Sequence, residues 1–114
     1  MSQEILEMIK KEIDSNTIVL FTKGTADMPM CGFSARAIAV FKELGKPFKT
    51  VDILPDPRIR QILTTVSNWP TVPQVFVGGK FIGGSDIVVE MFQKGELRPL
   101  VEQAFKAKQA APAR

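Results

Sequence analysis

The sequence predicts one α/β domain in which helices flank a four-stranded mixed sheet, in the order αβαβαββαα. The run of six apolar or β-branched residues at positions 17–22 is typical of a strand that is buried on both faces. A segment whose apolar residues have helical spacing separates this run from a second strand pattern at 48–53. The two strands are therefore expected to be parallel, with a right-handed crossover. Two further apolar runs flank a Gly-Gly pair, which predicts an antiparallel hairpin.

Two helices are predicted in the first half of the chain. The first follows Ser2, whose hydroxyl can cap it, and ends near residues 14–16. The second covers 33–44 and is followed by Gly45, a residue type that commonly ends helices in the left-handed conformation. The apolar residues at helical spacing are Ile5, Leu6, Ile9 and Ile13 in the first helix and Ala37, Ile38, Phe41 and Leu44 in the second.

A third helix and the hairpin follow. Asp56 stands before Pro57, and a capping residue followed by proline favours the start of a helix. The apolar face of this helix consists of Ile59, Ile62, Leu63 and Val66. Strands are then expected at 74–77 and 80–82, joined by a two-glycine turn that requires positive φ angles.

Two helices complete the predicted fold. Ser85 is expected to cap the first of them, which ends at Gly95. The apolar face of that helix consists of Ile87, Val88, Met91 and Phe92, and that of the last helix consists of Leu97, Leu100, Val101, Ala104 and Phe105. We expect residues 1–107 to form the domain and residues 108–114 to form a flexible tail.

The composition excludes several kinds of catalytic and metal site. The chain of 114 residues has one cysteine and no histidine, so it can form neither an intrachain disulfide nor a Cys-His or Ser-His nucleophile pair. A self-contained zinc site or four-cysteine cluster is excluded for the same reason. The N-terminal segment has no long apolar run, so we expect no signal peptide, no membrane span and a reducing compartment.

The charge distribution gives no support for nucleic-acid binding. The chain has 15 Lys and Arg residues against 12 Asp and Glu residues. Three of the basic residues, Lys106, Lys108 and Arg114, lie in the last nine positions, so the preceding part of the chain is neutral. A nucleic-acid interface needs a basic face on the folded body, and we therefore expect no nucleic-acid partner.

Cys31 is the candidate reactive residue. It lies in the loop that leads into the second predicted helix, where free N–H groups and the positive end of the helix dipole favour a thiolate. Lys23, just after the first strand, can add a second positive field. A free cysteine is often only a small buried apolar residue, but the neighbouring proline and glycine do not form a packed stripe. A reactive thiol is the favoured interpretation.

A proline-rich segment at 69–73, with the sequence Trp-Pro-Thr-Val-Pro, leads into the third strand. Pro73 cannot donate a hydrogen bond to a sheet, so from these residues alone a strand start bounded by proline is the favoured interpretation. The alternative is a cis bond before Pro73, which would leave the N–H and C=O groups of Val72 free to pair with a peptide-like ligand.

A glycine-rich turn formed by Gly83, Gly84, Ser85 and Asp86 precedes the fourth helix. Glycine permits close approach of a ligand, the helix N-terminus can bind a carboxylate, and Asp86 can bind an ammonium group. Arg60 can hold a second carboxylate. A plain capped turn and a solvated arginine are the simpler alternatives, but together with the thiol these groups would suit a small zwitterionic thiol peptide.

Four motifs in this order resemble those of the monothiol glutaredoxins of the single-domain CGFS type. The motifs are Lys23-Gly24, Cys31-Gly32-Phe33-Ser34, Trp69-Pro70-Thr71-Val72-Pro73 and Gly83-Gly84-Ser85-Asp86. The resemblance covers residues 3–107. It implies a thioredoxin fold that binds glutathione and, as a homodimer, a bridging [2Fe-2S] cluster.

The resemblance also implies a role for each site residue. Cys31 would ligate the cluster and form a mixed disulfide. The glutathione-binding residues would be Lys23, Arg60, Val72, Pro73, Gly84, Ser85 and Asp86. The first two would face carboxylates of glutathione, Val72 before a cis Pro73 would pair with its cysteinyl backbone, and the last three would hold its γ-glutamyl end. Phe33 and Ser34 belong to the motif but are assigned no contact with glutathione.

The single cysteine bears on the cluster independently of the resemblance. A [2Fe-2S] cluster usually needs four thiolate ligands, and one chain offers one. Two chains would supply two thiolates and two glutathione molecules would supply the others. Half of the ligands would then be exchangeable, which suits delivery of the cluster to an acceptor better than permanent electron transfer.

Three functions remain open at this stage. The leading hypothesis is an iron–sulfur carrier that accepts a cluster from a scaffold protein and passes it on, with a BolA-like protein as a further partner that the resemblance allows. The alternative is a glutathione-dependent oxidoreductase that acts on glutathionylated proteins by a monothiol mechanism. The third is a thiol-bearing binding module with neither activity. We expect a cytoplasmic protein of a bacterium, with an organelle matrix as the alternative.

Overall fold

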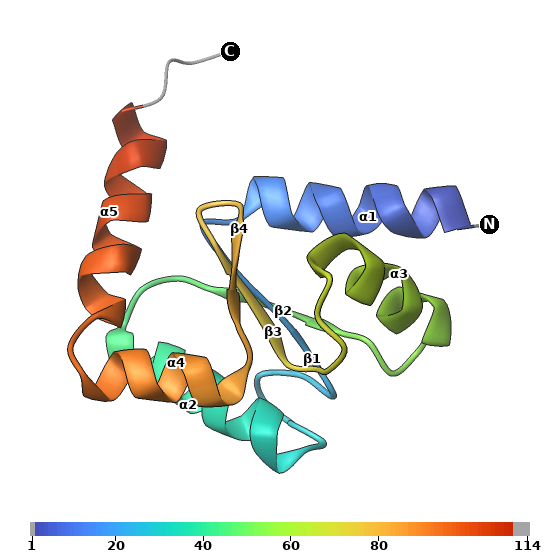
Figure 1. Ribbon diagram of the computed structural model, residues 1–114, viewed down its shortest axis with the longest axis horizontal. Coiled ribbons are helices and arrows are strands. Elements are labelled where there is room, and N and C mark those ends of the chain that lie inside the picture. The colour runs from blue at the N-terminus through green and yellow to red at the C-terminus, as the bar shows by residue number, and fades with distance from the viewer. Residues whose placement is uncertain (1, 111–114) are drawn as a thin grey trace.

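The computed structural model describes residues 2–110, and its elements follow the predicted order (Figure 1). The helices are α1 (Ser2–Ser15), α2 (Gly32–Leu44), α3 (Pro57–Ser67), α4 (Ser85–Gln93) and α5 (Leu97–Ala110). The strands are β1 (Ile18–Thr22), β2 (Lys49–Asp52), β3 (Gln74–Val77) and β4 (Lys80–Gly83). The αβαβαββαα order is therefore confirmed.

The four strands form one mixed sheet in the order β2-β1-β3-β4. Strand β1 pairs in parallel with β2, with Val19 opposite Lys49, and antiparallel with β3, with Phe21 opposite Gln74. All five residues of β1 are buried, as expected for a strand with neighbours on both sides and helices on both faces. The β3–β4 hairpin turns at Gly78 and Gly79 with φ angles of 62° and 82°, which confirms the predicted two-glycine turn.

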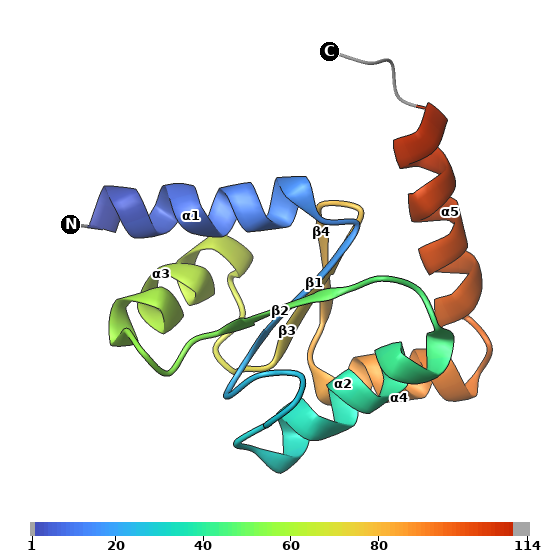
Figure 2. The same ribbon diagram turned by 180° about the vertical axis from the view of Figure 1, so that it is seen from behind.

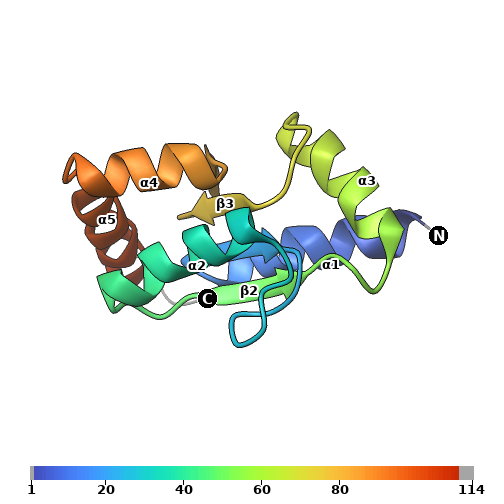
Figure 3. The same cartoon turned by 90° about the horizontal axis from the view of Figure 1, so that it is seen from below.

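Helices cover both faces of the sheet, as Figures 2 and 3 show. Successive side chains of a strand point to opposite faces, so β1 contributes to two separate apolar clusters. Ile18 and Leu20 pack with α2, α4 and α5 on one face, whereas Val19 and Phe21 pack with α1 and α3 on the other. The sheet is thereby held between two layers of helices, and the loops lie at the ends of its strands.

The start of α4 differs from the prediction. Gly84, and not Ser85, is the residue with extended backbone angles (φ −98°, ψ −161°) before the first helical turn. Ser85 is the first helical residue and makes no capping hydrogen bond, because its side chain is turned inward and is 5% exposed. By contrast, Asp56 caps α3 as predicted, and its carboxylate accepts a hydrogen bond of 3.0 Å from the N–H of Arg58.

The last helix extends further than predicted. Helix α5 continues to Ala110, three residues beyond the predicted domain boundary, and the Lys108 ammonium donates a hydrogen bond of 3.1 Å to the carbonyl of Ser15. Residues 111–114 of the predicted tail, and the side chains of Ser2, Gln109 and Ala110, lie outside the described part of the chain. Within residues 2–110, each helix is too short or too polar to cross a lipid bilayer.

Candidate functional site

The topology brings all four motifs to one edge of the sheet. Lys23 follows the carboxyl end of β1, and α2 begins near the same edge. Because β3 is antiparallel to β1, the 69–73 segment enters the sheet at this edge, and β4 returns to it to end at the 83–86 turn. Residues far apart in the sequence therefore surround one position, at the carboxyl end of the central strand, where open α/β sheets bind ligands.

A cavity of about 310 Å³ lies at this edge, and we call it the site cavity. Its lining residues are Lys23, Phe33, Arg60, Trp69, Thr71, Val72, Pro73, Gly84, Ser85, Asp86 and Ile87. This set contains all seven residues that the sequence analysis singled out for ligand binding. Cys31 is not itself a lining residue, but it lies two residues from Phe33 at the start of α2.

The sequence analysis missed several lining residues. Phe33 was assigned no contact with glutathione, yet it lines the cavity and this residue is 56% exposed. Ile87 was assigned to the buried face of its helix, but it is 39% exposed and lines the cavity. Trp69 and Thr71 belong to the proline-rich motif, and their closeness to Val72 in the sequence was the only signal that could have indicated them.

Cys31 is the N-cap residue of α2 and is partly exposed. The N–H group of Ser34 has the largest effect on the pKa of this thiol and lowers it, against a smaller opposing effect of burial. The N–H group of Phe33, the charge of Lys23 and the Ser34 hydroxyl lower the pKa further. The sulfur accepts no capping hydrogen bond of normal geometry, so the N–H groups stabilise the thiolate as nearby oriented dipoles.

The loop before Cys31 is fixed by hydrogen bonds that backbone N–H groups donate to backbone and side-chain acceptors. The N–H of Met30 donates to the carbonyl of Lys23 at 2.9 Å, and the N–H of Gly24 donates to a carboxylate oxygen of Asp52 at 2.9 Å. The buried Ser34 hydroxyl accepts a hydrogen bond of 3.1 Å from the N–H of Lys23. Ser34 thus connects the end of β1 to the first turn of α2 and helps to place Cys31.

The lowered pKa of Cys31 leads to a first prediction. A lower pKa leaves more thiolate at a given pH, and the thiolate is the reactive species. Alkylation by iodoacetamide should therefore reach half of its maximal rate at a lower pH than alkylation of an ordinary free thiol. Lys23→Gln should move this midpoint upward, because it removes a positive charge that favours the thiolate.

Lys10→Gln is the matched control for this measurement. It removes the same charge from an exposed position on α1, against the opposite face of the sheet, and should leave the midpoint unchanged. An equal shift in both variants would show that net charge, and not the position of Lys23, sets the thiol pKa. Mass spectrometry should find one alkylated thiol per chain, since Cys31 is the only cysteine.

The Val72–Pro73 peptide bond is cis. The simpler interpretation of this segment, a plain strand start bounded by proline, was therefore incomplete. Within residues 2–110, neither the N–H nor the C=O of Val72 has a hydrogen-bond partner. The side-chain amide of the buried Gln74 donates to the carbonyls of Trp69 and Thr71 at 3.0 and 3.1 Å and so fixes the segment.

The charged residues of the site cavity are largely available to a ligand. Among the described residues, Lys23 and Arg60 take part in no ion pair. Asp86 lies 3.7 Å from the guanidinium of Arg36, a contact that the sequence analysis did not foresee, but both side chains are exposed. An exposed pair of this kind contributes little, so the carboxylate remains accessible. The site thus offers two cationic groups and one anionic group.

Two buried polar atoms of the site have no partner. The Ser85 hydroxyl oxygen and the Trp69 indole nitrogen are both shielded from solvent, and neither makes a hydrogen bond within the described chain. Buried polar atoms are rarely left in this state. A ligand with acceptor groups at the start of α4 would satisfy them.

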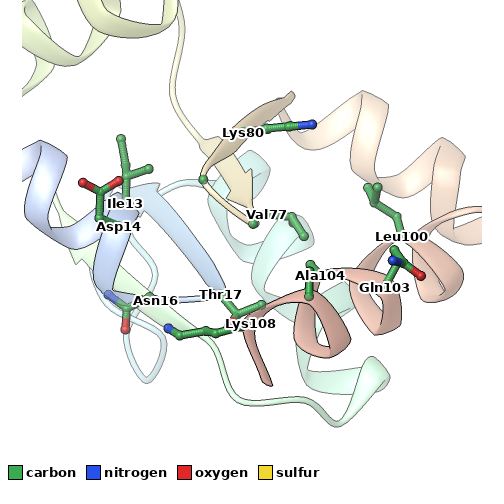
Figure 4. Close-up of a pocket in the computed structure, with 13 residues that line it drawn as sticks. Ile13, Asp14, Asn16, Thr17, Val77, Lys80, Leu100, Gln103, Ala104 and Lys108 are labelled. Carbon is green, nitrogen blue, oxygen red and sulfur yellow. The ribbon is translucent and has the colours of Figure 1, made fainter. Parts of the chain in front are cut away.

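A second cavity, of about 520 Å³, lies at the opposite end of β1 (Figure 4). It is bounded by the end of α1, the β3–β4 turn and α5, and Ile13, Val77 and Leu100 contribute apolar side chains to it. It contains no cysteine, and Thr17, which lines it, precedes β1, whereas Lys23 follows that strand. This cavity is therefore separate from the thiol.

Comparisons with known proteins show the family of the chain. The family model "Glutaredoxin" matches residues 18–82. An uncharacterized monothiol glutaredoxin, ycf64-like, of Synechocystis sp. is 46% identical over 105 residues, which is 92% of this chain and 98% of that protein.

Two solved structures are also similar. The buckwheat glutaredoxin–glutathione complex superposes with a TM-score of 0.80 at 30% identity, over 90% of this chain and 92% of that chain. The holo form of glutaredoxin C1 from Populus tremula x tremuloides superposes with a TM-score of 0.80 at 32% identity, over 99% and 96% of the two chains. By its fold, its single-cysteine motif and these relationships, the chain belongs to the monothiol glutaredoxins.

Proposed function

We propose that this chain binds glutathione in the site cavity and, as a homodimer, carries a [2Fe-2S] cluster from a scaffold protein to an acceptor protein. The observation that carries the proposal is a set of free polar groups around one cavity beside Cys31. Among the described residues, Lys23 and Arg60 form no ion pair and the buried Ser85 hydroxyl has no hydrogen-bond partner. The relative from buckwheat was solved in complex with glutathione, which supports the choice of ligand.

Glutathione matches the charged and hydrogen-bonding groups of the site cavity. The cationic side chains of Lys23 and Arg60 suit one carboxylate of glutathione, and the N–H groups at the start of α4 suit the other. Its ammonium group suits the Asp86 carboxylate. The free N–H and C=O groups of Val72 can pair with the cysteinyl backbone as a short added strand. Gly84 leaves room for the γ-glutamyl end against Ser85. A ligand held in this way would lie in the site cavity, beside the start of α2 where Cys31 stands.

The thiol chemistry of the chain also fits the cluster as cargo. Cys31 is partly exposed and its pKa is lowered, so it can bind iron as a thiolate without unfolding of the helix that it caps. Within residues 2–110, no three Cys, Asp or Glu side chains are placed together as a metal site. Two chains and two glutathione molecules would provide the four thiolates that such a cluster usually requires.

Anaerobic reconstitution with iron, sulfide and glutathione tests the carrier function. The expected product is a coloured dimer with two chains per cluster, as measured by absorption, iron content and mass in solution. Omission of glutathione should prevent formation of the dimer, because half of the ligands would be missing. A protein that remains colourless and monomeric with glutathione present would contradict the carrier function.

The Ser85 hydroxyl provides a separate prediction about the ligand. Ser85→Ala should weaken glutathione binding about tenfold, the size expected for one hydrogen bond to a charged group. The fold should be retained, since the substitution removes a buried oxygen that has no hydrogen-bond partner in the described part of the chain. Calorimetric titration would give the affinity and thermal unfolding would check the fold. An unchanged affinity would remove Ser85 from the site.

The lowered pKa of Cys31 favours a second function, that of a glutathione-dependent oxidoreductase. In this reaction the Cys31 thiolate attacks the glutathionyl sulfur of a mixed disulfide, and the substrate protein leaves as a thiolate. A second glutathione thiolate then attacks the glutathionyl sulfur bound to Cys31, which releases Cys31 and oxidised glutathione. Rapid turnover of a glutathionylated peptide by a protein that assembles no cluster would favour this function over the first.

The proposed function also implies partners and a compartment. A carrier needs a cluster donor and an acceptor, and the resemblance to the monothiol glutaredoxins adds a BolA-like protein to the partners to be tested. A lone thiol that works with reduced glutathione requires a reducing compartment. We therefore propose the bacterial cytoplasm, with an organelle matrix as the alternative.

A further inference from the structure

Trp69 presents a buried hydrogen-bond donor at the site cavity. Its indole nitrogen is shielded from solvent and has no acceptor within residues 2–110, although the side chain as a whole is only half-buried and lines the cavity. The indole N–H can donate but cannot accept. An acceptor that enters the cavity is therefore the partner that this group lacks.

The indole ring is fixed beside Gly84, the N-cap residue of α4. A methyl group added to Gly84, the N-cap of this helix, would lie 3.5 Å from the indole nitrogen. The ring packs against Phe81 with a centroid distance of 5.6 Å, and the carbonyl of Trp69 accepts a hydrogen bond of 3.0 Å from the Gln74 side chain. These contacts hold the indole nitrogen next to the start of α4.

A second unpartnered group lies at the same place. Ser85 follows Gly84 directly, and its buried hydroxyl also has no hydrogen-bond partner among the described residues. The N-cap residue of α4 has no side chain to satisfy the N–H groups of the first turn. Indole, hydroxyl and helix N–H groups are therefore adjacent, and together they suit an anionic acceptor such as a carboxylate.

We propose that the Trp69 indole N–H donates a hydrogen bond to the ligand carboxylate at the start of α4. Trp69 thereby selects ligands that carry the α-carboxylate of a γ-glutamyl residue. This inference rests on the proposed binding of glutathione and adds a specificity-determining residue to it. Because the indole nitrogen is already shielded from water, the carboxylate gains this hydrogen bond without a matching loss of hydration at the donor.

Calorimetric titration of Trp69→Phe with three ligands tests the proposal. The ligands are glutathione, an analogue with γ-aminobutyrate in place of the γ-glutamyl residue, and an analogue with an amide in place of the glycine carboxylate. Phenylalanine keeps an aromatic ring against Phe81 but has no N–H group. The variant should bind glutathione and the glycine amide about tenfold more weakly than the wild type does. It should bind the γ-aminobutyrate analogue as well as the wild type does.

Each result then has a distinct meaning. An equal loss for all three ligands would show that Trp69 only shapes the cavity, and an unchanged affinity for glutathione would show that the indole makes no hydrogen bond. Either result overturns the proposal but leaves glutathione binding intact. Failure of the wild type to bind glutathione would instead overturn the proposed function, and this inference with it.

The wild-type protein allows a second measurement that does not depend on folding of the variant. Trp69 is the only tryptophan of the chain, so a ¹⁵N-labelled sample gives one indole N–H signal. Glutathione should shift this proton signal downfield, as expected for a new hydrogen bond, and the γ-aminobutyrate analogue should not. A signal that moves equally with both ligands would contradict a specific contact with the carboxylate.

Discussion

Replacement of Cys31 by serine is expected to abolish cluster assembly completely and to leave the fold intact. Serine is a strong N-cap residue, so the start of α2 should be retained. A serine hydroxyl, however, does not provide the thiolate that an iron–sulfur cluster requires. Reconstitution of Cys31→Ser should therefore yield a colourless monomer, measured by absorption and by mass in solution.

The matched control for this loss is Ser34→Ala. It removes the hydroxyl group of a residue in the same motif but leaves the Cys31 thiol in place. Ser34→Ala should still form the coloured dimer, although its thiol pKa should be higher because the hydroxyl lowers that pKa. A coloured dimer from Cys31→Ser would show that another group holds the iron and would overturn the assigned role of Cys31.

Substitution of Gly24 by alanine should cause a large loss of stability, greater than that caused by the same substitution of Gly45. Gly24 has a φ angle of +89°, and an added methyl group would collide with the backbone oxygen of Met28 and lie 2.6 Å from the backbone nitrogen of Met30. Backbone atoms cannot move aside as a flexible side chain can. We expect the free energy of unfolding to fall by about 3 kcal/mol, measured by urea denaturation.

Gly45→Ala separates the two causes of this loss. Gly45 has a similar φ angle of +76°, but an added methyl group would meet no atom within 4 Å. This variant should lose only the backbone contribution, about 1 kcal/mol. Equal losses in the two variants would show that collision in the loop before Cys31 is unimportant. The loop is fixed to Lys23 through the Met30 N–H, so Gly24→Ala should also raise the thiol pKa.

The fold was predictable because short runs of residues and the spacing of apolar residues indicate where strands and helices form and which side chains are buried. The continuous apolar run of β1 indicated a central strand, and the spacing of apolar residues in α2 indicated the face that is buried. Errors occurred at element ends. Ser85 was placed at the cap of α4 because serine favours that position, but burial of its side chain moved the cap to Gly84.

The site was predictable in its residue types but not in its contacts. Motif order indicated which residues belong together, and the site cavity contains all seven expected binding residues. The contact between Arg36 and Asp86 and the position of Ile87 at the cavity have no sequence signal. Both depend on how α2 and α4 pack against each other across the same face of the sheet.

By itself, the sequence determined the chemistry that is available: one thiol, no histidine, and cationic residues in motifs typical of glutathione binding. Only the tertiary structure decided which of these groups act on one another. The start of α2 and Lys23 together lower the pKa of Cys31. The packing of Trp69 and Ser85 leaves two donors beside Gly84 that are shielded from solvent and have no partner within residues 2–110. The physical reason is that pKa values and hydrogen-bond satisfaction depend on distances and burial across separate elements, which no local pattern in a sequence records.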